Sequence, residues 1–233
     1  MFFREPMRLL PKEDLVKTGP FDCAAGLYKL HTGWLQKAGI RLGVDLLPNR
    51  VNRLLEIGYG SGVLMPELDT HTNQLYGIDP HALRHEVSER LRIHGVHPRL
   101  TTGTAEELPY ENGYFDRIIA VGSMEYINDI NTACREMIRV LAPGGRLVVV
   151  TAGMPATFGL GSQPPPGESQ KAVLSAREKL IPTLLQHFEV VRWWKYPPLL
   201  GNAFCLYHAL DLEPQSPVLT PHSQHSERKK MAV

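Results

Sequence analysis

A seven-residue segment that begins at Glu56 holds the residues whose types and spacing point most directly to chemistry. An apolar run ends in this carboxylate, and Gly58, Gly60 and Gly62 follow at alternate positions. Such a run is typical of a buried parallel strand, and glycines directly after it allow a tight turn. A ligand can lie against that turn because glycine has no Cβ. The segment therefore predicts a binding loop for a nucleotide-type cofactor.

A second carboxylate, Asp79, closes the next strand-like run. Neighbouring parallel strands end at the same edge of a sheet, so we expect Asp79 beside the glycine loop, where it can accept both hydroxyls of a ribose. A dehydrogenase uses a carboxylate in the same way, so Asp79 does not separate the cofactor classes. The glycine spacing does, because the nicotinamide or flavin fingerprint reads G-x-G-x-x-G and its third glycine would fall at Val63.

Strand-like and helix-like segments alternate around these residues. This alternation predicts right-handed crossovers and an α/β, Rossmann-like fold with a doubly wound, mainly parallel sheet. A turn cluster at 142–145 should end the third helix. Strands are predicted at 51–58, 74–79, 99–102, 115–121 and 146–151, and helices at 61–68, 81–94 and 130–141.

The pattern changes beyond residue 151. A loop rich in glycine and proline at 159–167 follows the fifth strand, and we expect it to act as a lid. A capping box then opens a helix that Pro182 should kink or divide. Two strand-like runs follow, at 189–196 and 204–212, and their short connection predicts an antiparallel hairpin at the edge of the sheet.

The composition is that of an ordinary globular domain. The chain has 233 residues, 43% of them hydrophobic, and a net charge of +1, which gives no electrostatic reason to expect nucleic acid or an anionic membrane as partner. Three cysteines without CxxC spacing indicate neither a disulfide framework nor a metal site. Residues 1–11 do not have the pattern of a signal peptide. No apolar segment approaches the length of about 18 residues that a membrane-spanning helix needs. We expect a cytoplasmic protein.

The segment at 56–62 resembles the first motif of class I S-adenosylmethionine-dependent methyltransferases. Four further stretches agree with the family in order and spacing, and one of them is similar to its G-D-A-x-x-L-P-F segment. The resemblance covers roughly residues 51–212, and the branch it is most similar to is the ubiquinone-biosynthesis and small-molecule branch. It implies S-adenosyl-L-methionine as cofactor and a seven-stranded sheet with the edge hairpin. The four stretches are 77–80, 103–110, 115–116 and 141–147.

The resemblance also implies an organisation of the chain. Residues 1–48 are expected to form an N-terminal helical cap that belongs to the same domain, because such helices often cover the cofactor in this family. Residues 49–212 would form the methyltransferase core. Residues 213–233, with prolines, serines and a basic cluster, are expected to be a disordered tail.

The methionyl side of the cofactor is assigned to the first motif. Glu56 would lie near the methionyl amine, and Gly58 and Gly60 would let the main chain approach the cofactor. Gly62 would open the following helix, whose first amides suit the methionyl carboxylate. Asp79 would take the ribose hydroxyls.

The adenine side is assigned to the neighbouring strand ends. Pro80 would pack on the ring, Ala105 would supply a backbone contact to it, and Ala120 would offer a carbonyl to the methionyl amine. One position departs from the family, since Thr104 stands where an aspartate usually bonds the adenine amino group. A neutral hydroxyl is the weaker acceptor, so we expect somewhat lower affinity than with an aspartate.

Methyl transfer asks mainly for alignment, because the sulfonium is already an activated donor. A phenol, hydroxyl or ammonium acceptor also needs a base. Glu125 and Tyr126 follow the fourth strand, where the methyl group should emerge, and His31 lies in the N-terminal helix, so these three are the catalytic candidates. Each has a plainer interpretation: Glu125 as a helix brace, Tyr126 as a packing residue and His31 as a surface residue.

The acceptor is predicted to be a small molecule that presents an oxygen, nitrogen or carbon nucleophile. No N-P-P-Y-like segment follows the fourth strand, which argues against methylation of a nucleobase or amide nitrogen. Two alternatives stay open. One is a non-catalytic, methyltransferase-like protein with a regulatory or assembly role. The other is an aminopropyltransferase-like relative, although the acidic cluster expected for a polyamine is not evident.

Overall fold

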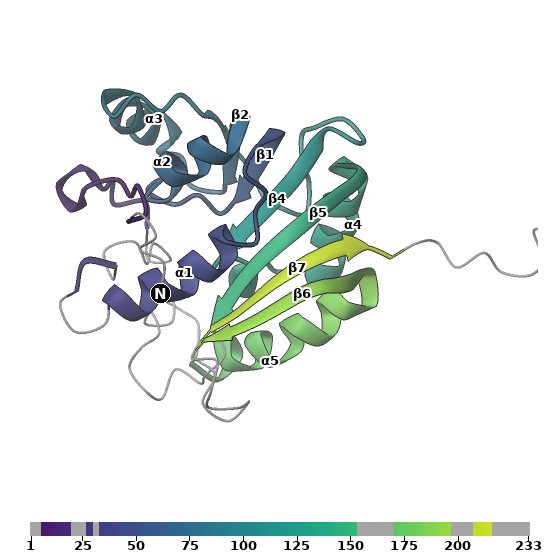
Figure 1. The fold of residues 1–233 in the computed structure, drawn as a ribbon. Helices are drawn as coiled ribbons and strands as arrows, with labels where there is room; N and C mark the ends of the chain where they lie inside the picture. Colours follow the sequence, from purple (N-terminus) through teal and green to yellow (C-terminus); the bar gives the residue numbers. More distant parts are fainter. Residues whose placement is uncertain (1–5, 20–26, 30–32, 153–169, 197–206, 216–233) are drawn as a thin grey trace, which may run out of the picture.

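The computed structural model describes residues 6–19, 27–29, 33–152, 170–196 and 207–215, and in these ranges seven strands form one sheet (Figure 1). The strand order is β3-β2-β1-β4-β5-β7-β6, with β7 antiparallel to both of its neighbours and the other pairs parallel. The predicted doubly wound sheet with an antiparallel edge hairpin is confirmed. The strands are β1 (Val51–Ile57), β2 (Thr72–Asp79), β3 (Arg99–Thr102), β4 (Phe115–Val121), β5 (Leu141–Ala152), β6 (Phe188–Tyr196) and β7 (Tyr207–Pro214).

Helices cover both faces of the sheet (Figure 1). Ile118 and Ile119 are neighbours in β4 and point to opposite faces, because side chains alternate along a strand. Ile118 belongs to a buried cluster with residues of α4 and α5, and Ile119 to one with residues of α1, α2 and α3. The helices are α1 (Gly33–Val44), α2 (Met65–Leu68), α3 (Arg84–Ile93), α4 (Ile130–Val140) and α5 (Gln170–His187), with short 3₁₀ turns η1 (Lys12–Asp14), η3 (Asp69–His71) and η4 (Met124–Tyr126).

Helix α1 is the described helix of the predicted N-terminal cap, and it lies directly on the sheet. Two glycines allow this close approach. A Cβ on Gly43 would lie 2.2 Å from the side chain of Val150 in β5, and one on Gly39 would lie 2.5 Å from the ring of Tyr207 in β7.

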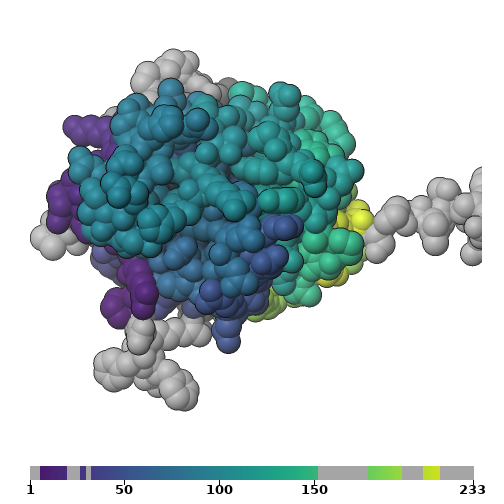
Figure 2. All heavy atoms as spheres, turned by 90° about the horizontal axis from the view of Figure 1, so that it is seen from above, coloured from purple at the N-terminus to yellow at the C-terminus, as the bar shows by residue number. Residues whose placement is uncertain are grey.

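The N-terminal segment at 6–19 runs over the layer formed by α2 and α3. Its Leu10 is fully buried and donates its N–H to the carbonyl of Val63, 3.0 Å away. Asp14 pairs with Arg90 and with His94 at the end of α3. Figure 2 shows this segment, in purple, lying against the blue-green surface of that layer. The contacts attach the start of the chain to the elements that follow the glycine turn.

Several element boundaries differ from the sequence prediction. Helix α2 is four residues long rather than spanning 61–68, and α5 continues through Pro182 instead of dividing there. Strand β5 begins at Leu141, ahead of the predicted 146–151, with its register against β4 shifted over the turn cluster. Strand β7 ends at Pro214.

Some predictions concern parts of the chain that the structure does not describe. The predicted lid at 159–167 lies outside the described residues, and so do residues 216–233 of the predicted tail. The first two residues of that predicted tail, Glu213 and Pro214, belong instead to β7. Among the described helices, none is long and apolar enough to cross a membrane.

Candidate functional site

The glycine turn lies between the ends of β1, β2 and β4. Gly58, Gly60 and Gly62 have φ values of +75°, +51° and +75°, in the left-handed region that favours glycine. The N–H of Gly58 donates to the carbonyl of Ile78, 2.8 Å away. A Cβ on Gly58 would lie 2.4 Å from that of Ser123, whose hydroxyl donates to the carbonyl at the end of β1. The turn is therefore held against both neighbouring strands.

The prediction that Gly62 opens a helix is wrong. The described helix begins at Met65, because the positive φ of Gly62 is incompatible with a helix interior. Gly62 is buried instead, and a Cβ there would lie 3.0 Å from side-chain atoms of Val87 and Leu91 in α3. Its place in the structure is a close packing contact between the turn and α3.

Asp79 and the glycine turn come together as the sequence predicted. One carboxylate oxygen of Asp79 accepts the N–H of Gly60 at 2.9 Å, and the other accepts the N–H of His81 at 3.2 Å. The carboxylate is half-buried and keeps further lone pairs for a ligand. A carboxylate held in this way can also accept hydrogen bonds from the hydroxyl groups of a ligand.

Glu56, two residues before the turn, has a buried carboxyl group with one unsatisfied oxygen. Its side chain is 4% exposed, and its Oε2 atom has no hydrogen-bond partner among the described residues. Burial, and after it the charge of Asp79, raises the pKa of Glu56 to about 8. A carboxyl group buried in this way is stabilised when a cation reaches it. The site therefore fits a ligand with an ammonium group, such as a methionyl amine.

The other residues assigned to the cofactor lie at the same edge of the sheet. Segment 103–105 is joined to the end of β2, because the N–H of Gly103 donates to the carbonyl of Asp79 at 3.0 Å. Thr104 and Pro80 are exposed, whereas Ala105 is buried. Ala120 is fully buried in β4 as the register partner of Ile57, the residue that precedes the turn.

The catalytic candidates are less accessible than the sequence suggested. Glu125 in η4 is 6% exposed, and the hydroxyl of Thr151 at the end of β5 donates to it at 2.5 Å. Tyr126 is half-buried in the same 3₁₀ turn. His31 lies outside the described residues. The structure thus brings Glu125 into a brace between η4 and β5, and the assignment of a base stays a prediction.

Sequence reasoning missed three residues that shape this site, namely His81, Ser123 and Thr151. Ser123 and Thr151 act through partners 66 and 26 residues away, so nothing local in the sequence signals them. His81 stands only two residues after Asp79, and this proximity was the one available signal.

Comparison with known proteins agrees with this geometry. A family model described as a methyltransferase domain matches residues 55–149, which run from β1 into β5. The chain contains a class I S-adenosylmethionine-dependent methyltransferase domain. The matched region includes both acidic residues, the glycine turn and the segment at 103–110, so the family resemblance seen in the sequence is confirmed.

Curated relatives of this methyltransferase domain include quinone-modifying enzymes. A ubiquinone/menaquinone biosynthesis C-methyltransferase UbiE from Vibrio campbellii is 30% identical over 137 residues, 54% of this chain and 51% of that protein. A 2-methyl-6-phytyl-1,4-hydroquinone methyltransferase from Oryza sativa is 32% identical over 97 residues, 40% of this chain and 28% of that protein. The chain thus spans about half, or less, of the length of these relatives.

Solved structures share the fold of the methyltransferase domain. A geranyl diphosphate methyltransferase solved with GPP and sinefungin has a TM-score of 0.60 at 18% identity, and the match covers 81% of this chain and 82% of that one. The [4+2]-cyclase SpnF has a TM-score of 0.58 at 20% identity, with 91% and 100% covered. At these identities the likeness concerns the fold alone.

Proposed function

We propose that this chain transfers the methyl group of S-adenosyl-L-methionine to a small-molecule acceptor. The observation that carries the proposal is the buried carboxyl group of Glu56, two residues before the glycine turn, whose Oε2 atom lacks a hydrogen-bond partner among the described residues. A dinucleotide offers no cation on that side of its ribose, whereas S-adenosylmethionine carries an ammonium group there.

Each part of the cofactor would be bound by a different group of the described residues. Glu56 would face the ammonium group, the turn at 58–62 would lie along the methionyl chain, and Asp79 would take the ribose hydroxyls. Ala105 and Pro80 would border the adenine. The sulfonium supplies an activated methyl group with a neutral leaving group, and the protein has to hold it in line with the acceptor and exclude water.

For the acceptor we propose a small molecule of the hydroquinone type as the first to test. This choice is supported by two relatives whose names describe methyl transfer in ubiquinone or menaquinone biosynthesis and to a hydroquinone. The near-neutral charge of the chain also suits an uncharged acceptor better than a polyanion. Removal of a phenolic proton is assigned to Glu125, Tyr126 or His31, as the sequence analysis predicts.

Methyl transfer can be tested with tritiated S-adenosylmethionine and a panel of prenylated hydroquinones, phenols and amines. A labelled product is required, because one neighbour of the same fold is a cyclase. Loss of a charged partner costs about 1.5–3 kcal/mol, so Glu56→Gln should weaken cofactor binding by about tenfold or more. Glu189→Gln, at an exposed position near the start of edge strand β6, is the matched control and should leave binding unchanged.

Two outcomes would count against the proposal in different ways. If calorimetry finds no binding of S-adenosylhomocysteine to the wild type, the cofactor assignment fails. If the cofactor binds but no compound in the panel is labelled, the non-catalytic alternative is supported instead.

A further inference from the structure

Gly60, in the middle of the glycine turn, is held through both of its main-chain polar groups. Its N–H donates to Asp79 Oδ2 at 2.9 Å, and its carbonyl oxygen lies 2.9 Å from Nε2 of His81. Both contacts come from residues 79–81, at the end of β2. Within this stretch the backbone N–H of His81 also donates to Asp79. His81 thus touches the turn with its ring and the ribose-binding carboxylate with its main chain.

The contacts of His81 define its hydrogen positions. The N–H of Leu83 lies 3.1 Å from Nδ1, so Nδ1 must accept. The neutral ring therefore carries its hydrogen on Nε2 and donates it to Gly60. The ring also packs edge-on against Tyr59, with centroids 5.0 Å apart, and the side chain is 9% exposed. One imidazole satisfies both polar partners in this tautomer.

This arrangement matters because of the conformation of Gly60. Its φ is +51°, and glycine populates both signs of φ readily, so the peptide would turn freely without external contacts. A loop that is ordered before its ligand arrives binds more tightly, because no conformational entropy is lost in ordering the loop when the ligand binds. The ring of His81 and the carboxylate of Asp79 supply that order together.

We propose that His81 is a positioning residue for cofactor binding: it fixes the Gly60 peptide, and through it the carboxylate of Asp79, before the cofactor binds. The inference rests on the proposed function and adds a residue that belongs to none of the recognised motifs. His81 acts through Gly60 and Asp79 and is not itself assigned a contact with the cofactor.

Matched variants separate the hydrogen bond from packing. In His81→Gln the side-chain amide nitrogen can take the place of Nε2, whereas in His81→Asn it reaches only as far as Nδ1. His81→Phe keeps the ring against Tyr59 without either hydrogen bond. One hydrogen bond is worth about 0.5–1.5 kcal/mol, so calorimetry with S-adenosylhomocysteine should show binding weakened by about two- to tenfold in the Asn and Phe variants and nearly unchanged in the Gln variant.

A second measurement reports on the turn itself. Amide hydrogen exchange at Gly60 in the ligand-free protein should be faster in His81→Asn than in the wild type or His81→Gln, while the strands keep their protection. A purely structural role would lower the thermal midpoint without this local change. His85→Phe, at an exposed position in α3, is the control and should change neither readout.

The result that overturns the inference is equal affinity in wild type, His81→Gln and His81→Asn, or a larger loss in Gln than in Asn. The Gln and Asn pair is sufficient if His81→Phe does not fold. Absence of S-adenosylhomocysteine binding to the wild type would instead overturn the proposed function, so the two failures are distinguishable.

Discussion

At the scale of single residues, the carboxylates of Glu56 and Asp79 next to the glycine turn differ in their hydrogen bonds. Asp79 accepts peptide N–H groups from Gly60 and His81, whereas Oε2 of Glu56 has no hydrogen-bond partner among the described residues. Burial and the neighbouring Asp79 raise the pKa of Glu56 to about 8, so at pH 7 the free protein should hold a proton there. A bound ammonium group favours the ionised form and reverses this balance.

Cofactor binding should therefore release a proton. As the pH rises towards about 8, less work is needed to ionise Glu56 and the affinity should increase. Above that pH Glu56 is already ionised in the free protein, so the affinity should level off. Calorimetry with S-adenosylhomocysteine at pH 7, in two buffers of different ionisation enthalpy, should find about one proton released per ligand.

Two controls assign that proton to Glu56. The ligand 5′-methylthioadenosine lacks the amino acid part and should bind without proton release. The Glu56→Gln variant should bind S-adenosylhomocysteine more weakly and also without release. Release that persists in this variant would show that another group titrates.

The raised pKa of Glu56 should also lower stability at alkaline pH. The ordinary carboxyl pKa is 4.5, and the folded value is about 8. Between these values the folded state binds more protons than the unfolded state, so the free energy of unfolding falls as the pH rises. Glu56→Gln removes this loss. Thermal midpoints of the two proteins should agree near pH 4.5 and separate in favour of the variant towards pH 8.5; parallel curves would contradict the assignment.

Gly58 and Gly95 offer a matched comparison of strain and crowding. Both have a φ of +75°, but a Cβ on Gly58 would lie 2.4 Å from that of Ser123, whereas one on Gly95 would meet nothing within 4 Å. Gly95→Ala should cost about 1–2 kcal/mol from the left-handed backbone alone. Gly58→Ala adds overpacking of about 1–3 kcal/mol. Urea denaturation checks this, and equal losses would mean that the turn relaxes away from Ser123.

Sequence reasoning reached the residues of the site whose function depends on type and spacing, and missed those whose function depends on contacts. Glu56, Asp79 and the three glycines are close in sequence and follow strand ends, so their meeting could be inferred. The hydroxyl of Ser123 reaches the carbonyl of Ile57 across two strands, and that contact exists only in the folded sheet.

At the scale of elements, local geometry explains where the predicted boundaries moved. The strands were recognisable because short apolar runs mark them. Helix α2 was predicted too long because a left-handed Gly62 cannot be read from the sequence, and α5 passes Pro182 because buried Leu180 and Leu184 anchor both sides of it. Tertiary packing outweighs the local propensity in the second case.

The packing of α1 on the sheet depends on the absence of a side chain at Gly43. A Cβ there would lie 2.2 Å from Cγ2 of Val150, a β-branched core residue with little freedom to move. Gly43→Ala should therefore lower the free energy of unfolding by about 1–2 kcal/mol, the cost of overpacking exceeding the gain in helix propensity. Val150→Ala should remove the clash, so a double-mutant cycle should show a favourable coupling of about 1 kcal/mol. Additive losses would mean that α1 shifts as a body.

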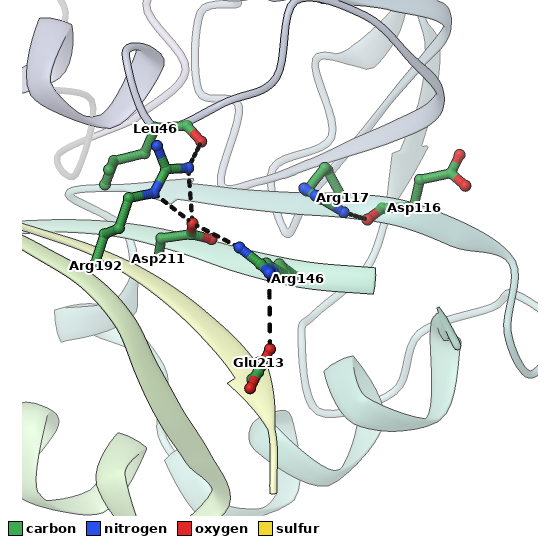
Figure 3. Close-up of polar contacts among 7 residues, drawn as sticks. All are labelled: Leu46, Asp116, Arg117, Arg146, Arg192, Asp211 and Glu213. Carbon is green, nitrogen blue, oxygen red and sulfur yellow. Dashed lines mark hydrogen bonds and ion pairs between the residues drawn. The ribbon is translucent and has the colours of Figure 1, made fainter. Parts of the chain in front are cut away.

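At the scale of the whole molecule, one buried carboxylate joins the edge hairpin to the rest of the fold (Figure 3). Asp211 in β7 is 1% exposed, and one of its oxygens accepts hydrogen bonds from Arg192 in β6 and Arg146 in β5. Arg192 also donates to the carbonyl of Leu46, just after α1, at 2.6 Å. Three strands and the end of α1 thus converge on one charge. The glycine turn follows β1, and strands β4 and β5 lie between β1 and β7.

Removing that charge should destabilise the fold without affecting the cofactor site. Breaking a buried ion pair costs about 3–5 kcal/mol, but Arg192 and Arg146 are 43% and 31% exposed and can turn to solvent, so we expect about 1–3 kcal/mol for Asp211→Asn. Glu213→Gln is the matched control, because Glu213 is 46% exposed and lies 3.9 Å from Arg146. The free energy of unfolding lost in Glu213→Gln should stay below about 0.5 kcal/mol.

Urea denaturation measures the stability of both variants, and calorimetry should find the same affinity for S-adenosylhomocysteine in Asp211→Asn and Glu213→Gln. If the two variants lose equal stability, the charge of Asp211 does not hold the hairpin. If Asp211→Asn lowers the affinity for S-adenosylhomocysteine, the edge hairpin and the cofactor site are coupled.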